Sequence, residues 1–371
     1  MPTERGRRPC MPTGGDPPAA AVLAAAPRRH ALGDRVVSTS ANPLKHLAPG
    51  WFAVVMGLAG LSLAWHAAVP MLGDGAAAAG VVIGGLAAIV FIALAAASAW
   101  RLQHHPQAWA DDLRHPVRHV FVAAMPISLL LLVTTAVAAG GRGPLLEGLW
   151  WLASLAQLSV TVWVVSRWWR GTSSAGLPWA SLTPGLFIPI VGNVLVPLAG
   201  VPLGRPEWAA AQFGVGLLFW PVVLVLLLVR LAHQGPWPER LLPSNFIFIA
   251  PPAVVGLAVL RFGAPPLVAW ALWGGALASL LWAATVLRRI ADQPFGIPHW
   301  GMSFPMAAFT ALTLRLAPAD GAASLAGLAL LAVTSLLVAA LVLATWRGLR
   351  QGTLLVPEAV PIGVAPGSAP G

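Results

Sequence analysis

Titratable side chains that could do chemistry gather in one segment of this sequence, between two long apolar runs. The segment contains the adjacent pair His104 and His105 and the adjacent pair Asp111 and Asp112. It ends with His115 and His119, which are four residues apart. That spacing places two imidazoles on one face of a helix, where they could bind a metal ion. The group consists of His104, His105, Asp111, Asp112, His115 and His119. A solvated basic loop is the default interpretation, and we expect neither a metal site nor any other cofactor.

Ionisable groups are almost absent from the apolar runs themselves. No Asp or Glu lies near the middle of any run, and Glu147 stands at the start of one. Proton-coupled carriers usually need buried carboxylates or histidines, and an intramembrane enzyme needs a nucleophile with a base or clustered metal ligands. The only lysine is Lys45, and no glycine-rich loop precedes it, which excludes a phosphate-binding P-loop. We therefore expect no enzyme activity, and the pattern favours an uncharged passage.

Uncharged polar residues inside the apolar runs are the candidates for lining such a passage. Hydroxyls and amides can donate hydrogen bonds to an anion, and basic residues at a mouth raise the local anion concentration. For each hydroxyl, a hydrogen bond back to its own helix is an equally good interpretation. The candidates are Ser62, Ser128, Thr134, Asn193, Ser244, Asn245, Ser303, Thr310 and Thr313.

Composition identifies the elements that must position these residues. Of 371 residues, 58% are hydrophobic and 9% are charged, whereas soluble domains carry roughly 25% charged residues. The runs have the length of about 20 residues that crosses a hydrocarbon core, and they are too long and too uniformly apolar for barrel strands. We predict an all-α integral membrane protein with spans at 48–69, 77–100, 117–139, 144–167, 182–203, 208–231, 241–261, 265–287, 300–317 and 322–346.

The spans repeat as pairs, which predicts five helical hairpins around a central pore. The first member of each pair begins near residue 48, 117, 182, 241 or 300. Prolines concentrate in these first members, and proline kinks a helix, which bilayer depth tolerates only beside protein or a water-filled cavity. We expect these helices to form the inner ring. The prolines are Pro126, Pro189, Pro197, Pro251, Pro252 and Pro305.

The basic residues predict the topology. With both termini in the cytoplasm, 18 of the 22 basic residues fall on the inner side, and Arg142, Arg205, Arg261 and Arg315 on the outer side. The net charge of +10 therefore needs no nucleic-acid partner. We predict a multi-pass inner (plasma) membrane protein with disordered cytoplasmic tails at 1–43 and 351–371 and a ten-helix channel domain at 44–350.

Several segments resemble the tellurite-resistance/dicarboxylate transporter family, which includes the plant slow anion channels and a bacterial tellurite-resistance homologue. The similarity extends over roughly 45–350 and is carried by Leu44–His66, His115–Leu130, Phe187–Leu198, Pro238–Val254 and Trp300–Met306. The resemblance implies ten helices in a quasi-five-fold arrangement, one pore per protomer and a homotrimer. It also implies small anions as the transported species.

The resemblance further implies a gate. In the channels of this family a phenylalanine within a Thr-Phe-Pro segment of the ninth helix blocks the pore, and the matching residues here are Ser303, Phe304 and Pro305. Phe304 is the inferred gate, and Phe248 joins the pore-lining candidates. Phe304 is only six residues past Pro298, or about 9 Å at the α-helical rise, which places it in the inner third of the bilayer. The alternative function is a secondary carrier for C4-dicarboxylates, sulfite or tellurite.

Overall fold

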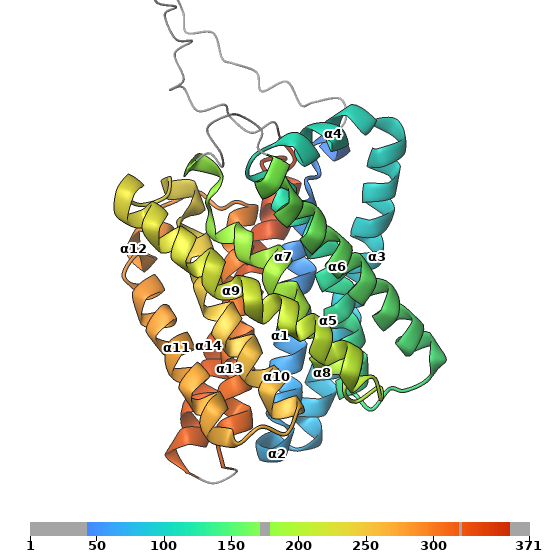
Figure 1. Ribbon diagram of the computed structural model, residues 1–371, viewed down its shortest axis with the longest axis vertical. Helices are drawn as coiled ribbons and strands as arrows, with labels where there is room; N and C mark the ends of the chain where they lie inside the picture. Colours follow the sequence, from blue (N-terminus) through green and yellow to red (C-terminus); the bar gives the residue numbers. More distant parts are fainter. Residues whose placement is uncertain (1–42, 171–178, 319–320, 357–371) are drawn as a thin grey trace, which may run out of the picture. The chain divides into compact units, whose positions relative to one another are not determined.

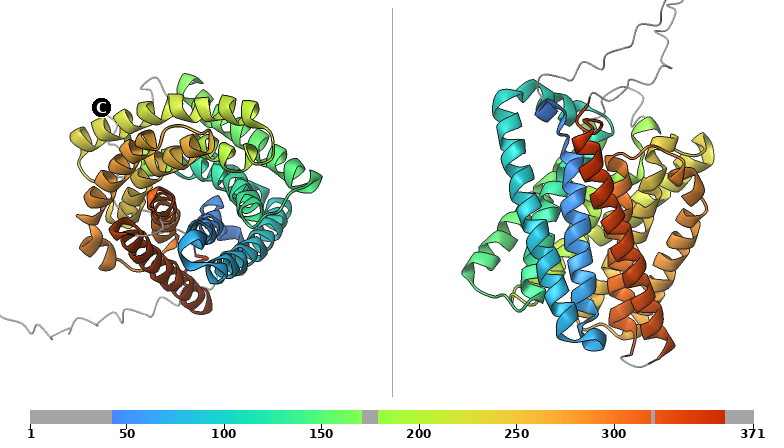
Figure 2. Two further views of the ribbon diagram at one scale, coloured as in Figure 1. Left: turned by 90° about the horizontal axis from the view of Figure 1, so that it is seen from below. Right: turned by 180° about the vertical axis from the view of Figure 1, so that it is seen from behind.

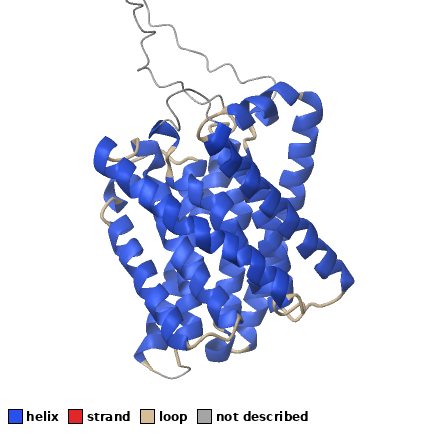
Figure 3. Ribbon diagram, in the orientation of Figure 1, coloured by secondary structure: helices blue, strands red, loops and turns tan. Residues whose placement is uncertain are grey.

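A computed structural model describes residues 43–170, 179–318 and 321–356. Within those ranges the regular structure is entirely helical, with no strand (Figure 3). The predicted tails fall largely on residues 1–42 and 357–371, which lie outside the described residues.

The helices form two concentric layers (Figures 1 and 2). Three inner spans, at Pro49–Ala67, Arg118–Ala138 and Glu239–Arg261, have 67% to 83% of their apolar windows buried, whereas five outer spans have 11% to 33% buried. The inner layer comprises α1 (Ala53–Ala67), α5 (Ala124–Ala138), α7 and α8 (Phe187–Val191 and Val196–Gly200, joined by η6, Gly192–Leu195), α10 (Ala250–Arg261) and α13 (Ser303–Leu316). The outer layer comprises α3 (Asp74–His104), α6 (Pro144–Arg170), α9 (Pro206–Gln234), α11 (Pro266–Ala284) and α14 (Ala322–Arg350).

The long helices match the hydropathy pattern closely. Eight of the described helices are long and apolar enough to cross a membrane. The other two inner elements are shorter: Pro184–Gly200 is an apolar helical stretch interrupted by a 3₁₀ segment, and α13 has 14 residues. These eight helices make the protein a multi-pass membrane protein.

Every inner helix starts with tight 3₁₀ turns, a feature that hydropathy does not predict. The 3₁₀ segments are η2 (Pro49–Phe52), η3 (Arg118–Ala123), η5 (Pro184–Leu186), η7 (Glu239–Ile249) and η8 (Ile297–Met302). An α-helix follows each of these segments, and the inner prolines lie within its first three residues. Pro197 has the same position in α8, the helix that follows η6. The missing N–H of proline costs least in a first turn. The prolines therefore stand at 3₁₀-to-α junctions rather than at kinks in the middle of long helices.

The segment predicted to be a solvated loop between the second and third spans is instead partly helical. Here α4 (Pro106–Arg114) crosses the end of the bundle, and its Asp112 is buried. Two further short helices, α2 (Val69–Leu72) and α12 (Leu287–Ala291), cap other ends of the long helices.

Candidate functional site

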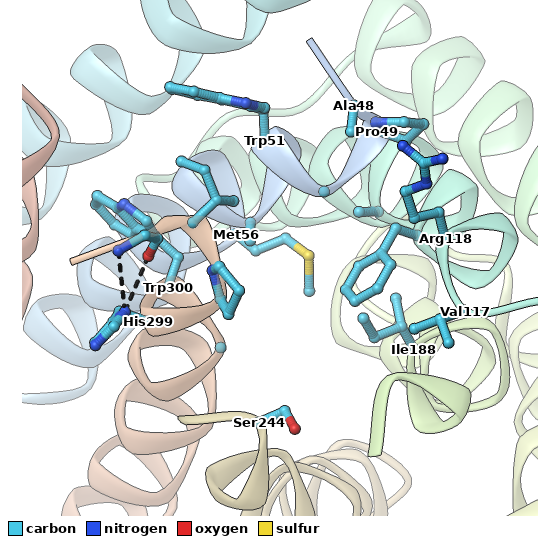
Figure 4. A pocket seen from close by; sticks show the side chains of 18 of the residues that line it. Ala48, Pro49, Trp51, Met56, Val117, Arg118, Ile188, Ser244, His299 and Trp300 are labelled. Atoms are coloured by element: carbon cyan, nitrogen blue, oxygen red, sulfur yellow. Dashed lines mark hydrogen bonds between the residues drawn. The ribbon is translucent and has the colours of Figure 1, made fainter. Parts of the chain in front are cut away.

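A large cavity of about 710 Å³ lies at the α4 end of the inner helices. Four basic and two acidic side chains line it, so its fixed charge is positive without counting histidines. Figure 4 shows Met56, Ile188 and Ser244 reaching into this space from different elements, with Arg118 at its rim. The charged lining residues are Lys45, Arg101, Asp111, Asp112, Arg118 and Arg240.

A buried ion-pair cluster fixes α4 over the cavity. The Asp112 carboxylate forms ion pairs with Arg101 Nη1 at 2.8 Å and with Arg118 Nη1 at 3.1 Å. Arg101 is 2% exposed and Asp112 is 1% exposed. The Arg101 Nε also donates to the carbonyl of Lys45 at 2.9 Å, so one guanidinium ties α3 and α4 to the segment that enters α1.

Histidines at the cavity are held by local hydrogen bonds. His299 Nδ1 lies 3.2 Å from the amide nitrogen of Gly296 and 3.1 Å from its carbonyl oxygen, as Figure 4 shows. His115 Nδ1 accepts from the amide of Val117 at 3.1 Å. Burial, with Lys45 and Arg101 nearby, lowers the pKa of His46 and so favours its neutral imidazole. Within the described ranges, no three His, Cys, Asp or Glu side chains are grouped to hold a metal ion.

Phe304 lies where the large cavity ends. It lines the large cavity, and it also lines a small cavity of about 20 Å³. The side chain is buried at 7% exposure. Gly60 of α1 allows this placement, since a Cβ at that position would lie 3.0 Å from the Phe304 ring carbon Cδ2. Phe304 and Leu195 are the two residues that line both of these cavities.

One face of each inner helix runs from the large cavity to the small one. Lining residues follow one another at intervals of three or four, the spacing of a single helical face. The rows are Met56, Gly60 and Leu63 on α1; Ile127 and Leu131 on α5; Val191, Leu195 and Leu198 on α7 to α8; Ala250, Val254 and Leu257 on α10; and Phe304, Ala307, Ala308 and Ala311 on α13. These rows of lining residues are apolar.

The segment that leads to Phe304 is longer along its axis than an α-helical count suggests. Its first six residues form η8, and a 3₁₀ helix rises about 2.0 Å per residue against 1.5 Å for an α-helix. This adds a few ångströms to the depth of Phe304.

Among the predicted lining residues, Phe304, Pro305 and Ser244 line the large cavity. The hydroxyls of Ser62, Ser128, Ser303 and Thr310 are fully buried and bonded within the bundle. They donate, in that order, to the carbonyls of Gly80, Ala124, Trp300 and Met306, at 2.7 to 2.8 Å.

Other predicted residues pack between helices. Phe248 makes edge contacts with Phe187 and Trp282, each at 5.2 Å between ring centroids. The rings of Pro126, Pro189 and Pro251 are buried at their helix junctions. Thr134 and Thr313 bond back to carbonyls of their own helices.

Asn193 belongs to a polar network between the broken inner helix and the outer layer. Its Nδ2 donates to Thr161 Oγ1 at 2.8 Å and to the Pro189 carbonyl at 3.0 Å, and its Oδ1 accepts from Gln212 Nε2 at 3.0 Å. Gln157 Nε2 donates to the same Pro189 carbonyl at 2.8 Å. The outer helices α6 and α9 thus supply partners for backbone that η6 interrupts.

Sequence reasoning missed two groups of residues at this site. The ion-pair cluster could not be predicted because Asp111 and Asp112 are adjacent acidic residues in the sequence. Only the helical fold of α4 buries Asp112 and leaves Asp111 exposed. The apolar rows were hidden among many leucines and alanines. A signal did exist for the second group, because counting in steps of three or four from Phe304 finds Ala307, Ala308 and Ala311.

Fold and cavities together define a multi-pass helical membrane protein with two cavities between its inner helices. The profile of the voltage-dependent anion channel family matches residues 46–346. This match covers most of the sequence, and the chain belongs to that family.

Individual relatives agree with the family match. The chain is 26% identical to a tellurite resistance protein TehA homolog from Haemophilus influenzae, over 70% of this chain and 78% of that protein. It is 29% identical to the S-type anion channel SLAH2 of Arabidopsis thaliana, over 55% of this chain and 39% of the channel, so it spans well under half of that relative. It is also 23% identical to the sulfite efflux pump SSU1 of Arthroderma otae, over 72% and 81% of the two chains.

Proposed function

We propose that this protein passes small anions across a membrane along the path between its inner helices, and that Phe304 closes this path. One observation carries the proposal: Phe304 lines both the large basic cavity and the small apolar cavity, which supports a position of its ring between them. A large ring in a narrow path blocks ions by its bulk and by excluding water. The family match supports the transported class.

The charge on the large cavity supports anions over cations. Its lining contains Lys45, Arg101, Arg118 and Arg240 against Asp111 and Asp112. A cleft lined by one sign of charge with low-dielectric walls concentrates counter-ions. Asp112 is also largely neutralised by its two arginine partners, so an approaching anion meets mainly positive charge.

The proposal includes an arrangement in the membrane. Ten helices cross the bilayer as five hairpins, the eight long spans together with Pro184–Gly200 and α13. Lys45 and Val356 both line the large cavity, which supports a common side for the two ends of the domain. The basic bias supports the cytoplasm as that side, and the plasma membrane stays a prediction. The homotrimer expected from the family resemblance stays a prediction.

The test is to measure chloride currents for Phe304→Ala beside the unaltered protein in planar bilayers. We expect a larger current, because removing the ring joins the two cavities. Phe309→Ala is the matched control: Phe309 lies on the same helix, is buried, and stacks on Trp273 at 5.7 Å instead of lining either cavity. Equal amounts of protein that elute normally on size exclusion are compared. Unchanged or lost current with Phe304→Ala would count against the gate.

A secondary carrier is the second candidate, because the similar sulfite efflux pump is named for export of an anion. A large cavity that ends at a closed barrier is expected for a closed channel. It is equally expected for a carrier in the state that is open to one side of the membrane. Large unitary currents favour the channel, whereas saturable uptake coupled to a gradient favours the carrier. Neither candidate requires catalysis, and we propose no enzyme activity.

A further inference from the structure

A ring of aliphatic side chains surrounds the small cavity just beyond Phe304. Each inner element contributes one member: Leu63 from α1, Leu131 from α5, Leu198 from α8, Leu257 from α10 and Ala311 from α13. We call these five residues the leucine collar. Its members lie one helical turn or two further along the path than the residues that surround Phe304.

The small cavity is poorly suited to water. A buried water needs about 10–15 Å³ of probe volume and 2–4 polar partners, and the cavity offers about 20 Å³. Its described lining consists of Gly, Ala, Val, Leu and Phe residues, none with a polar side chain. Space for one water without partners for it describes a dry constriction, and hydrophobic constrictions close ion paths by dewetting.

The leucine collar is held firmly in place. Leu131 is fully buried and Leu198 is 6% exposed. The inner helices approach closely on either side of the path: a Cβ at Gly60 would lie 3.1 Å from Ala307 Cβ, and one at Gly256 would overlap Leu312. Packing of this kind leaves the collar little room to widen without a shift of whole helices.

We propose that the leucine collar is a second, hydrophobic barrier in series with Phe304, so that an anion must pass both. This proposal rests on the proposed function and deepens it. Removing the Phe304 ring leaves the path dry at the collar, because none of the collar side chains depends on that ring for its position on its own helix. A polar side chain of similar size at the collar wets the constriction without widening it.

The experiment measures chloride current in planar bilayers for Leu131→Asn, Leu63→Asn and Leu257→Asn, each combined with Phe304→Ala. Each combination is expected to exceed Phe304→Ala alone by roughly tenfold, which corresponds to a barrier lower by about 1.4 kcal/mol. Leu132→Asn in the same background is the matched control. It neighbours Leu131 on α5 but lines neither cavity, and its current is expected to equal that of Phe304→Ala alone.

The outcomes separate the two proposals. Larger current in Phe304→Ala with no further increase in the collar variants would overturn the collar and leave the gate intact. No increase in Phe304→Ala but an increase in the combinations would support the collar and place the higher barrier there instead of at Phe304. No increase in any variant overturns both. Leu63 and Leu257 are only partly buried, so they keep the test decisive if the fully buried Leu131 does not tolerate asparagine.

Discussion

The hydroxyl of Thr161 contacts polar groups of both the outer helix α6 and the broken inner helix. Its single hydroxyl proton has two carbonyl acceptors within reach, Pro189 at 2.6 Å and Gln157 at 2.8 Å, and its Oγ1 accepts from Asn193 Nδ2 at 2.8 Å. All of these groups are buried. A polar group left without a partner in an apolar interior costs far more than the net gain from one hydrogen bond.

Thr161→Val is therefore expected to destabilise the protein by about 1–2 kcal/mol, because it removes the shared hydroxyl while keeping the shape of the side chain. A thermal melt in detergent is expected to show a lower Tm. Thr285→Val is the control, since Thr285 is exposed and its hydroxyl bonds only to the nearby Trp282 carbonyl. Equal melting temperatures for both variants would contradict a stabilising role for the network.

The same network shows why single residues were the hardest part to predict from sequence. Asn193, Ser62, Ser128 and Thr310 are polar residues on inner helices, which made each a candidate for the path. Their neighbours Leu63, Ile127 and Ala311 face the path instead. Adjacent residues on a helix are separated by about 100° of rotation, and this rotation depends on packing between helices that hydropathy does not encode.

At the scale of elements, α4 depends on one carboxylate. Asp112 holds Arg101 and Arg118, and the Arg101 guanidinium in turn bonds the carbonyls of Lys45 and Ala108. Removing one partner from a buried ion pair leaves a charge that neither water nor an opposite charge compensates.

Asp112→Asn is expected to lower stability by about 3–5 kcal/mol, because the buried Arg101 loses its counter-charge. Asp111→Asn supplies the control on the adjacent, exposed carboxylate, where little change is expected. Thermal unfolding in detergent compares the two variants. The ion-pair cluster would lose its assigned role if Asp112→Asn melted at the same temperature as Asp111→Asn.

Span positions were the most predictable feature at this scale. The eight long helices begin and end within a few residues of the hydropathy runs, because apolar length is what the bilayer selects. The 3₁₀ segments escaped prediction, since their prolines were equally consistent with kinks in longer α-helices. The helix α4 also escaped, because its charged sequence resembles that of a solvated loop and its buried face depends on Arg101, which is in another helix.

At the scale of the whole molecule, charge is distributed around the large cavity in a way that predicts a dependence on salt. Arg240 lines the cavity, whereas Arg288 lies at the start of α12 and does not. Attraction of mobile ions by exposed charges is screened beyond about 8 Å at physiological ionic strength.

Arg240→Glu is expected to reduce chloride current several-fold at low salt, with the deficit shrinking as ionic strength rises. Current measured in a chloride concentration series for Arg240→Glu and Arg288→Glu tests this expectation. A similar loss for both variants, or a loss that persists at high salt, would argue against electrostatic concentration of anions in the cavity.

The uncharged character of the barrier has a consequence for how the protein responds to the electric field. In the part of the chain that the structure describes, the side chains between Phe304 and the leucine collar carry no formal charge. A transmembrane voltage does work only on charge that moves through it, about 2.3 kcal/mol for each elementary charge across 100 mV. Rotation of an aromatic ring or spreading of leucines moves none. If Phe304 and the leucine collar form the proposed barrier, the field acts on the permeating ion and not on these side chains, and opening requires wetting or displacement of the surrounding helices.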